Sequence, residues 1–288
     1  VLEYAGGISR QFGAKAALRA DYVYRDYRDF YTSQTDTSTG KVSDSLGQQY
    51  DLTLIVNSNV PKRKYQALNT QGTYRFNART DVGGTYTLSH AWGNWEGENV
   101  GSGPITAGFL QYPEYKQASW NYPEGDLQID QRHRARIWVD YGLPMVSGLT
   151  ISALQTLETG TPYGASNINN TSSNGVDPRF YVTNTFGYLT PPTGATSTYF
   201  FTARDGFRLE GQKRTDLALS YNYGVGSGPR KIDLFMQAQI INVFGQEQLC
   251  GCGGTVFQNG GGVTQTRIDQ TVRTSVSHPA LYQSFNPF

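Results

Sequence analysis

The chain has 288 residues, with 24 lysines and arginines against 23 aspartates and glutamates, and a formal net charge of +1 at pH 7. A nucleic-acid-binding protein normally carries a strongly basic surface, so this near-neutral balance argues against a nucleic-acid partner. The sequence contains no apolar run close to the roughly 18 residues of a membrane helix, so any membrane span has to be made of strands. Its 33 glycines and 20 tyrosines, beside only two methionines, favour β-strands and turns.

Alternating apolar and polar residues predict strands along most of the chain. The first two, over Leu2–Arg10 and Lys15–Arg25, are joined by a tight connection at Gln11–Gly13. After the irregular segment Asp26–Arg63, a β-hairpin is predicted over Lys64–Gly93, where one parity is apolar and the other polar. Each arm has about a dozen residues, close to the roughly 9–11 with which a tilted strand crosses a bilayer.

Four more strands are predicted over Asp130–Tyr141, Leu149–Thr159, Arg208–Tyr223 and Lys231–Phe244. The first of them is the most informative, because arginines alternate in it with apolar residues. An arginine on the lipid face near the bilayer midplane costs about 2–4 kcal/mol, so the arginine face is expected to look into an aqueous interior. The same reasoning gives one set of predicted lumen-facing residues along the chain: Arg19, Asp21, Arg75, Arg132, Arg134, Arg136, Arg214, Asp216 and Asp233.

The predicted connections are short and long in turn along the chain. Outer-membrane barrels have this arrangement, with tight periplasmic turns and long extracellular loops, whereas a soluble sandwich has no reason for it. Aromatic residues of the apolar parity lie near strand ends and predict an aromatic girdle: Tyr22, Tyr24, Tyr74, Phe76, Trp92, Tyr141, Tyr221, Tyr223 and Phe244. The sequence therefore predicts an all-β fold, an antiparallel transmembrane β-barrel with long extracellular loops, in contact with lipid of the bacterial outer membrane.

Four short stretches at these strands carry a resemblance to a known family: Arg63–Leu68, Asp130–Arg134, Thr159–Tyr163 and Ile241–Phe244. They resemble the C-terminal part of TonB-dependent outer-membrane receptors, in particular the Oar-like group with its carboxypeptidase-regulatory-like N-terminal domain. The resemblance implies a barrel of about 22 strands with a plug domain, which imports a ligand, here unidentified, with energy relayed by the TonB complex through the plug. On this interpretation residues 1–288 are the C-terminal part of the receptor barrel, about eight strands of it, without its plug domain. We then expect further barrel strands outside the chain, which should continue past Phe288.

The sequence offers no catalytic or metal-binding pattern. His90 and His133 share the outward parity near the loop ends of strands expected to be neighbours, and no cysteine or carboxylate joins them at ligand spacing, so packing at the membrane interface is expected. No serine has a Gly-x-Ser-x-Gly context, and no glycine-rich segment lies between a strand and a helix. We therefore expect neither an enzyme nor a cofactor.

Three questions stay open at the level of sequence. Cys250 and Cys252 lie in the glycine-rich segment Gln246–Gly262 and are candidates for a disulfide, either with each other or with another chain. The inward charges either contact the plug or line a path for the ligand. The alternative fold is a stand-alone eight-stranded barrel with a structural or adhesion role, because paired arginines and aspartates could fill so narrow an interior.

Overall fold

The computed structural model describes residues 1–38, 41–97, 105–116, 122–164, 166–170, 185–190, 196–200, 202–225 and 232–247. All regular elements within these ranges are β-strands. The described part of the chain contains no helix that is long and apolar enough to cross a membrane. Cys250, Cys252 and the end of the chain lie outside the described residues.

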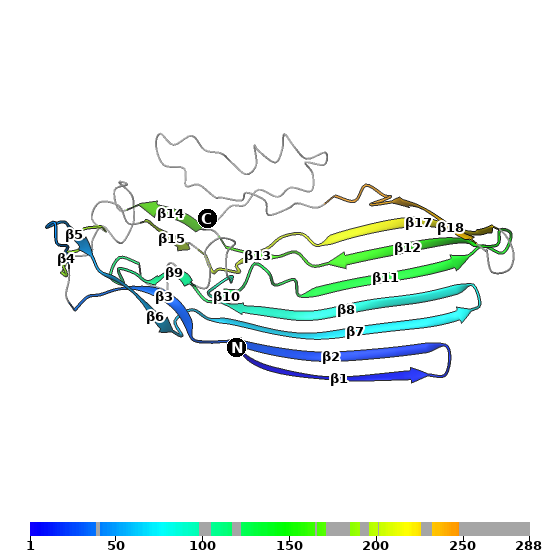
Figure 1. Ribbon diagram of the computed structural model, residues 1–288, viewed down its shortest axis with the longest axis horizontal. Helices are drawn as coiled ribbons and strands as arrows, with labels where there is room; N and C mark the ends of the chain where they lie inside the picture. Colours follow the sequence, from blue (N-terminus) through cyan, green and yellow to red (C-terminus); the bar gives the residue numbers. More distant parts are fainter. Residues whose placement is uncertain are drawn as a thin grey trace.

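Eight long strands form one antiparallel sheet in which each pairs with its neighbours in chain order (Figure 1). They are β1 (Leu2–Phe12), β2 (Ala16–Tyr27), β7 (Arg63–Asn77), β8 (Thr80–Gly93), β11 (His133–Gly142), β12 (Leu149–Glu158), β17 (Gln212–Val225) and β18 (Ile232–Ile240). Short β10 (Gly125–Asp126) also pairs with β8, beyond the start of β11. Among the described strands β1 pairs only with β2 and β18 only with β17, so the described sheet is open at both edges.

The predicted all-β, antiparallel character of the main sheet is confirmed. A closed barrel is not present in the described part of the chain. The predicted hairpin is β7 and β8, which pair from Arg63 opposite Gly93 to Asn77 opposite Thr80. The long strands predicted from alternation pair in the order in which they follow one another along the chain, as consecutive strands usually do.

Three predicted strand ends differ from the structure by three residues or more. The strand predicted from Asp130 begins at His133, because the amide of Asp130 donates to Leu127 O (2.7 Å) and bends the chain away from β8. Arg208 lies outside β17 and belongs to β16 (Phe207–Arg208), which pairs with β13 (Pro162–Tyr163). At the other end of the sheet, β18 stops before Asn242, whose φ of 55° turns the chain.

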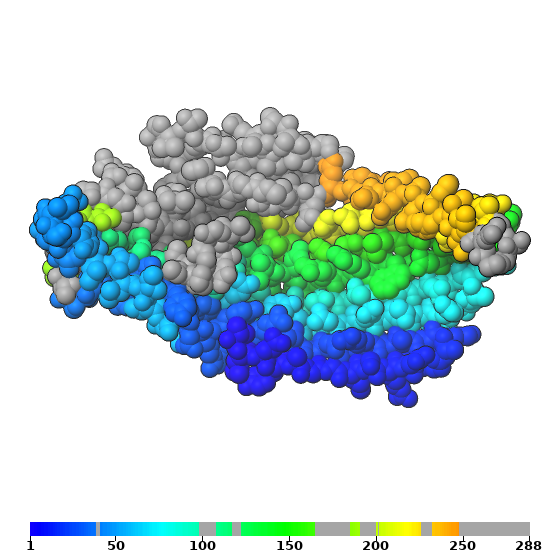
Figure 2. Space-filling model, viewed as in Figure 1, coloured from blue at the N-terminus to red at the C-terminus, as the bar shows by residue number. Residues whose placement is uncertain are grey.

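The short connections lie at one end of the main sheet and the long ones at the other (Figure 1). Within the long connections, β3 (Phe30–Thr35) pairs with β6 (Thr53–Ser58) and, in parallel, with β9 (Ile105–Leu110). Two smaller pairs join β4 (Lys41–Ser43) to β5 (Gln49–Asp51), and β14 (Ser166–Asn170) to β15 (Thr196–Phe200). Figure 2 shows these segments gathered beyond one end of the continuous layer of long strands.

The long connections also share a small core. Tyr112, Tyr115 and Tyr188 are buried against one another, and the rings of Tyr112 and Tyr188 meet edge to face at 5.1 Å between centroids. Asp51 accepts hydrogen bonds from the amides of Leu189 and Thr190 and from the Tyr112 hydroxyl. Buried tyrosines and the hydrogen bonds of Asp51 thus hold together segments that are far apart in sequence. They lie at the end of the sheet with the long connections, which we call the loop side.

The register gives the main sheet one apolar and one polar face, because directly paired residues point to the same side. One row of the apolar face crosses all eight long strands: Phe12, Ala16, Tyr74, Val82, Val139, Ala153, Leu217 and Ile240. A row of the opposite face consists of polar side chains: Ser9, Arg19, Gln71, Thr85, Arg136, Thr156 and Arg214. Large apolar side chains of the first face are exposed, Ile137 by 50% and Leu219 by 44%.

Candidate functional site

The polar face of the main sheet is the first candidate site. The register places eight of the predicted lumen-facing residues on this face: Arg19, Asp21, Arg75, Arg134, Arg136, Arg214, Asp216 and Asp233. Arg132 is the exception, since it precedes β11 and its guanidinium bonds to Asp126 and Asp130 at the end of the strands. Whether this face looks into a lumen stays a prediction.

Most charges on the polar face neutralise each other. Five ion pairs join arginines and carboxylates along or across strands: Arg19–Asp21 (2.6 Å), Arg25–Glu3 (2.5 Å), Arg75–Asp81 (2.9 Å), Arg134–Glu158 (3.4 Å) and Arg214–Asp216 (3.1 Å). Three of them, Arg19–Asp21, Arg25–Glu3 and Arg75–Asp81, are exposed on both sides, and such pairs contribute only about 0–1 kcal/mol each. Their main effect is therefore on the electrostatic potential of the face, which they keep close to neutral.

Arg136 and Trp138 interrupt this pattern near the middle of the sheet. Arg136 forms no ion pair with a carboxylate that the structure describes. Trp138 lies on the polar face directly opposite Gly83, where a Cβ would come within 2.3 Å of the indole ring. Sequence reasoning missed this tryptophan, although the glycine pair Gly83–Gly84 in the neighbouring strand was a usable signal for a bulky side chain opposite.

The predicted aromatic girdle divides into two groups on the apolar face. Tyr74, Phe76, Tyr141, Tyr221 and Tyr223 lie toward the short turns. Tyr22, Tyr24 and Trp92 lie toward the long connections, and Phe244 follows the loop-side end of β18. The apolar face is thus bordered by aromatic side chains at both ends, while its contact with a membrane interface stays a prediction.

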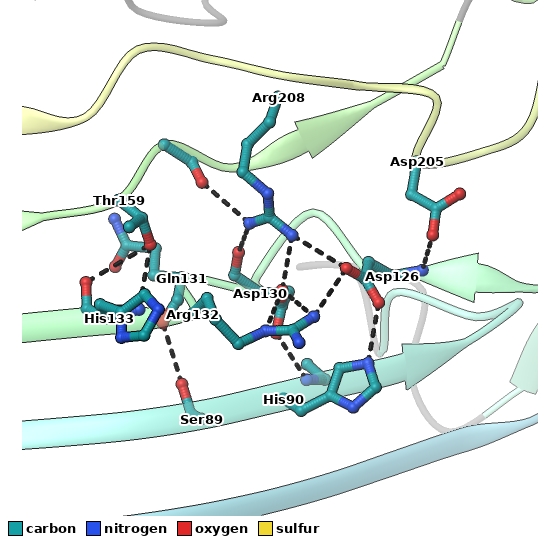
Figure 3. A network of polar contacts seen from close by, with 12 residues as sticks. Ser89, His90, Asp126, Asp130, Gln131, Arg132, His133, Thr159, Asp205 and Arg208 are labelled. Carbon is teal, nitrogen blue, oxygen red and sulfur yellow. Dashed lines mark hydrogen bonds and ion pairs between the residues drawn. The ribbon is translucent and has the colours of Figure 1, made fainter.

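The second candidate site is a strand-end cluster of His90, Asp126, Asp130, Arg132 and Arg208 (Figure 3). Arg132 Nη2 lies 2.8 Å from Asp126 Oδ2 and 3.2 Å from Asp130 Oδ2. Arg208 Nη2 lies 2.8 Å from the same two oxygens. His90 Nε2 contacts the other oxygen of Asp126 at 2.8 Å. Two arginines therefore share two carboxylates where the strands end and the long connections begin.

Asp130 is the centre of the strand-end cluster and is fully buried. Its Oδ1 accepts a hydrogen bond from the Ala91 amide (2.8 Å), so the carboxylate takes the place of a backbone carbonyl on the edge of β8 between β10 and β11. Burial alone would raise the pKa of Asp130. The Ala91 amide, Arg208 and Arg132 outweigh burial, and the pKa of this carboxyl group, which lies outside the strands, is lowered.

The strand-end cluster fastens a long connection to the sheet. Arg208 also donates from Nη1 to the carbonyl oxygens of Asp130 (2.7 Å) and Gly160 (3.0 Å). Asp205, from the same connection, accepts from the amide of Asp126 (2.9 Å). Of the cluster, sequence reasoning named Arg132 as a site residue but did not connect it to Asp126 or Arg208, which is 76 positions further along the chain. The arrangement can position loops, and it presents no nucleophile with an adjacent base.

The histidines make separate contacts. His90 bonds to Asp126, whereas His133 Nδ1 lies 2.8 Å from the Tyr86 hydroxyl. Within the described ranges, no group of three or more histidine, cysteine or acidic side chains is placed to hold a metal ion. The disulfide candidates Cys250 and Cys252 are outside those ranges, so their state is not tested.

Comparison with known proteins does not identify the family of this chain. No protein-family model matches the chain, and no curated protein matches it. Among solved structures, the chain is similar to the outer membrane transporter YddB from Escherichia coli, with 14% identity and a TM-score of 0.48. The match covers 85% of this chain and 29% of that one, so the chain spans less than a third of the transporter. None of these comparisons identifies the Oar-like group, which stays a prediction.

Proposed function

We propose that the main sheet is part of the wall of a transport barrel in the bacterial outer membrane, with its apolar face toward lipid and its polar face toward the interior. The observation that carries this proposal is the position of charge on the apolar face. Within the eight long strands, the Lys, Arg, Asp and Glu residues on that face are Arg10, Asp26, Lys64 and Lys213. Each lies within two residues of a strand end, so the middle of the face is free of charge.

Polar side chains in the middle of the apolar face also support the proposal. In hydrocarbon, each unsatisfied polar group costs several kcal/mol, so such groups need partners within the protein. The Thr215 hydroxyl donates to Gln155 Oε1 (2.6 Å), and Gln155 Nε2 donates to Arg214 O (3.1 Å). Thr70 Oγ1 donates to Tyr86 O (3.2 Å). These groups are satisfied without water, as a lipid-facing surface requires.

The height of the charge-free band fits a membrane. On β17 it runs from Thr215 to Val225. Ten steps of roughly 3.3 Å, tilted by about 40°, give a height near 25 Å. That is about the thickness of the apolar band of outer-membrane barrels. In a soluble protein this exposed apolar face would instead be an aggregation risk.

The open edges support a larger barrel than the described sheet. Within the described strands the outer edges of β1 and β18 have no partner, and unpaired backbone groups are costly in a bilayer, so we propose that further strands complete the wall. The stretches that resemble TonB-dependent receptors support a finer proposal, in which a plug domain packs against the polar face and the TonB complex energises import. The paired charges of that face suit a wall that packs against protein.

A matched pair of substitutions in β17 tests the orientation of the sheet. Leu219 lies on the apolar face and Ala218 on the polar face at the same height. Leu219→Arg should cost about 2–4 kcal/mol and strongly reduce the heat-modifiable protein recovered from the outer membrane, whereas Ala218→Arg should assemble like the parent. Equal recovery of the two variants would contradict the proposed orientation.

The finer proposal has its own test. In cells, cross-linking should recover TonB with the natural protein that carries this chain, and a chain that never cross-links to TonB would count against energised import. Assembly of residues 1–288 alone into a protease-resistant, heat-modifiable barrel would favour the small structural barrel instead.

A further inference from the structure

A cavity of about 440 Å³ opens where β2 and β7 leave the main sheet for the long connections. Its lining includes Tyr27, Arg28, Asp29, Phe30, Arg63 and Trp95. Tyr27 and Arg63 are directly opposite in the register and lie on the polar face of the sheet. The volume lies in the lower part of the range of about 300–1,000 Å³ that is typical of small-molecule sites.

Arg63 is held in one position in the wall of this cavity. Its guanidinium lies over the Tyr27 ring, 5.5 Å from the centroid, and Nη1 donates to Glu96 O. Gly97 packs against the other side with φ of 118°, and a Cβ there would lie 1.9 Å from Nη1. The Nε atom of Arg63 is buried, and no residue that the structure describes accepts a hydrogen bond from it. A buried charged donor without an acceptor is destabilising, so a ligand that supplies an acceptor to this guanidinium would be favoured.

The remaining lining combines flat aromatic surfaces with fixed polar groups. Phe30 and Trp95 meet edge to face at 4.6 Å between centroids, so each ring supports the other. The carboxylate of Asp29 is held by Asn59 Nδ2 at 3.0 Å. Arg28 is held by Asp26, with its Nη2 at 2.6 Å from Asp26 Oδ2. Aromatic rings with adjacent donors and acceptors suit a ligand that has both an apolar ring face and hydroxyl groups.

We propose that this cavity binds an acidic saccharide. The sugar carboxylate accepts hydrogen bonds from Arg63, the ring face lies against the aromatic wall, and hydroxyl groups bond to Asp29 and Arg28. The inference rests on the proposed function for one point, that the loop side faces the outside of the cell and makes the cavity accessible there. Binding itself requires only the folded protein.

The test is calorimetric titration of the natural protein, purified in detergent micelles, with glucuronate and with glucose as the neutral sugar of the same ring. We expect glucuronate to bind and glucose to bind at least tenfold more weakly. Arg63→Gln should weaken glucuronate binding at least tenfold, to the level of glucose. Arg19→Gln, which removes an arginine from the same face outside the cavity, should leave the affinity for glucuronate unchanged.

A second variant keeps the proposal testable if the Arg63→Gln protein does not fold. Gly97→Ala keeps every charge and displaces Arg63 sterically, so it should also weaken glucuronate binding. Glucuronate should change the fluorescence of Trp95, and Trp95→Phe should remove that change. No glucuronate binding by the parent protein, or equal binding of glucuronate and glucose, would overturn the proposal. Binding is measured in micelles and does not depend on how the sheet lies in a membrane. A negative binding result would therefore leave the proposed orientation, which is tested at Leu219 and Ala218, unaffected.

Discussion

Removal of the Asp130 carboxylate should loosen the junction between the sheet and its long connections. The side chain is fully buried and accepts bonds from the Ala91 amide (2.8 Å), from Arg208 (2.8 Å) and from Arg132 (3.2 Å). Removing one partner of a buried pair costs about 3–5 kcal/mol. Here Asp126 still pairs with both arginines, which are about a third exposed, so we expect about 2–3 kcal/mol for Asp130→Ala.

Asparagine at position 130 separates the contribution of the hydrogen bond to the Ala91 amide from that of the negative charge. Asp130→Asn keeps an oxygen for the Ala91 amide but loses the charge that faces Arg132 and Arg208, so it should cost about half as much as alanine. The exposed pair Asp81–Arg75 provides the control, since Asp81→Asn should cost no more than about 1 kcal/mol.

The assay is hydrogen exchange of the Ala91 amide, measured on the natural protein in detergent micelles. A loss of about 2–3 kcal/mol speeds exchange through local opening by roughly 30- to 150-fold, because each 1.4 kcal/mol is tenfold. Asp130→Ala should show this increase, Asp130→Asn a smaller one, and Asp81→Asn none at Ala91. Unchanged exchange in Asp130→Ala would refute the view that this carboxylate completes the edge of β8.

Two further predictions concern single residues. Because the folded pKa of Asp130 is lowered, its contribution is fully present above the unfolded pKa of about 3.9 and is lost as pH falls through the folded pKa. The protection of the Ala91 amide, taken relative to its intrinsic exchange rate at each pH, should therefore fall at acid pH in the parent and less so in Asp130→Asn. Gly83→Ala should push the indole of Trp138 off the sheet, because the new Cβ would lie 2.3 Å from the ring. The substitution should therefore shift the tryptophan fluorescence, and the shift should be absent when Trp138 is also replaced by phenylalanine. An unchanged spectrum in Gly83→Ala would contradict the contact.

The strands could be predicted because their signal is local. In β8 the residues Val82, Tyr86 and Leu88 share one parity, and a period of two fixes which side chains share a face. The order of the main sheet is also simple, since each long strand pairs with the next long strand along the chain. The grouping of the predicted inward charges on one face followed from the same parity.

The strand-end cluster and the cavity could not be predicted in this way. Asp130 needs the Ala91 amide 39 positions away and Arg208 78 positions away, and neither pairing follows from a repeating pattern. Arg132 was assigned to a strand because its parity matched that of Arg134. In the structure the carboxylate of Asp130 is buried, and β11 begins only at His133. The contact of Arg63 with Glu96 likewise depends on how a long connection folds back.

The central claim is that one face of the main sheet contacts lipid and the other does not. Single cysteines along β8, from Val82 to Leu88, can carry a fluorophore in a protein whose Cys250 and Cys252 are replaced by serine. In bilayers with a quencher attached to the lipid chains, labels at Val82, Gly84, Tyr86 and Leu88 should be strongly quenched and those at Thr85 and Thr87 weakly quenched. Uniform quenching along the strand, or the opposite alternation, would contradict the account.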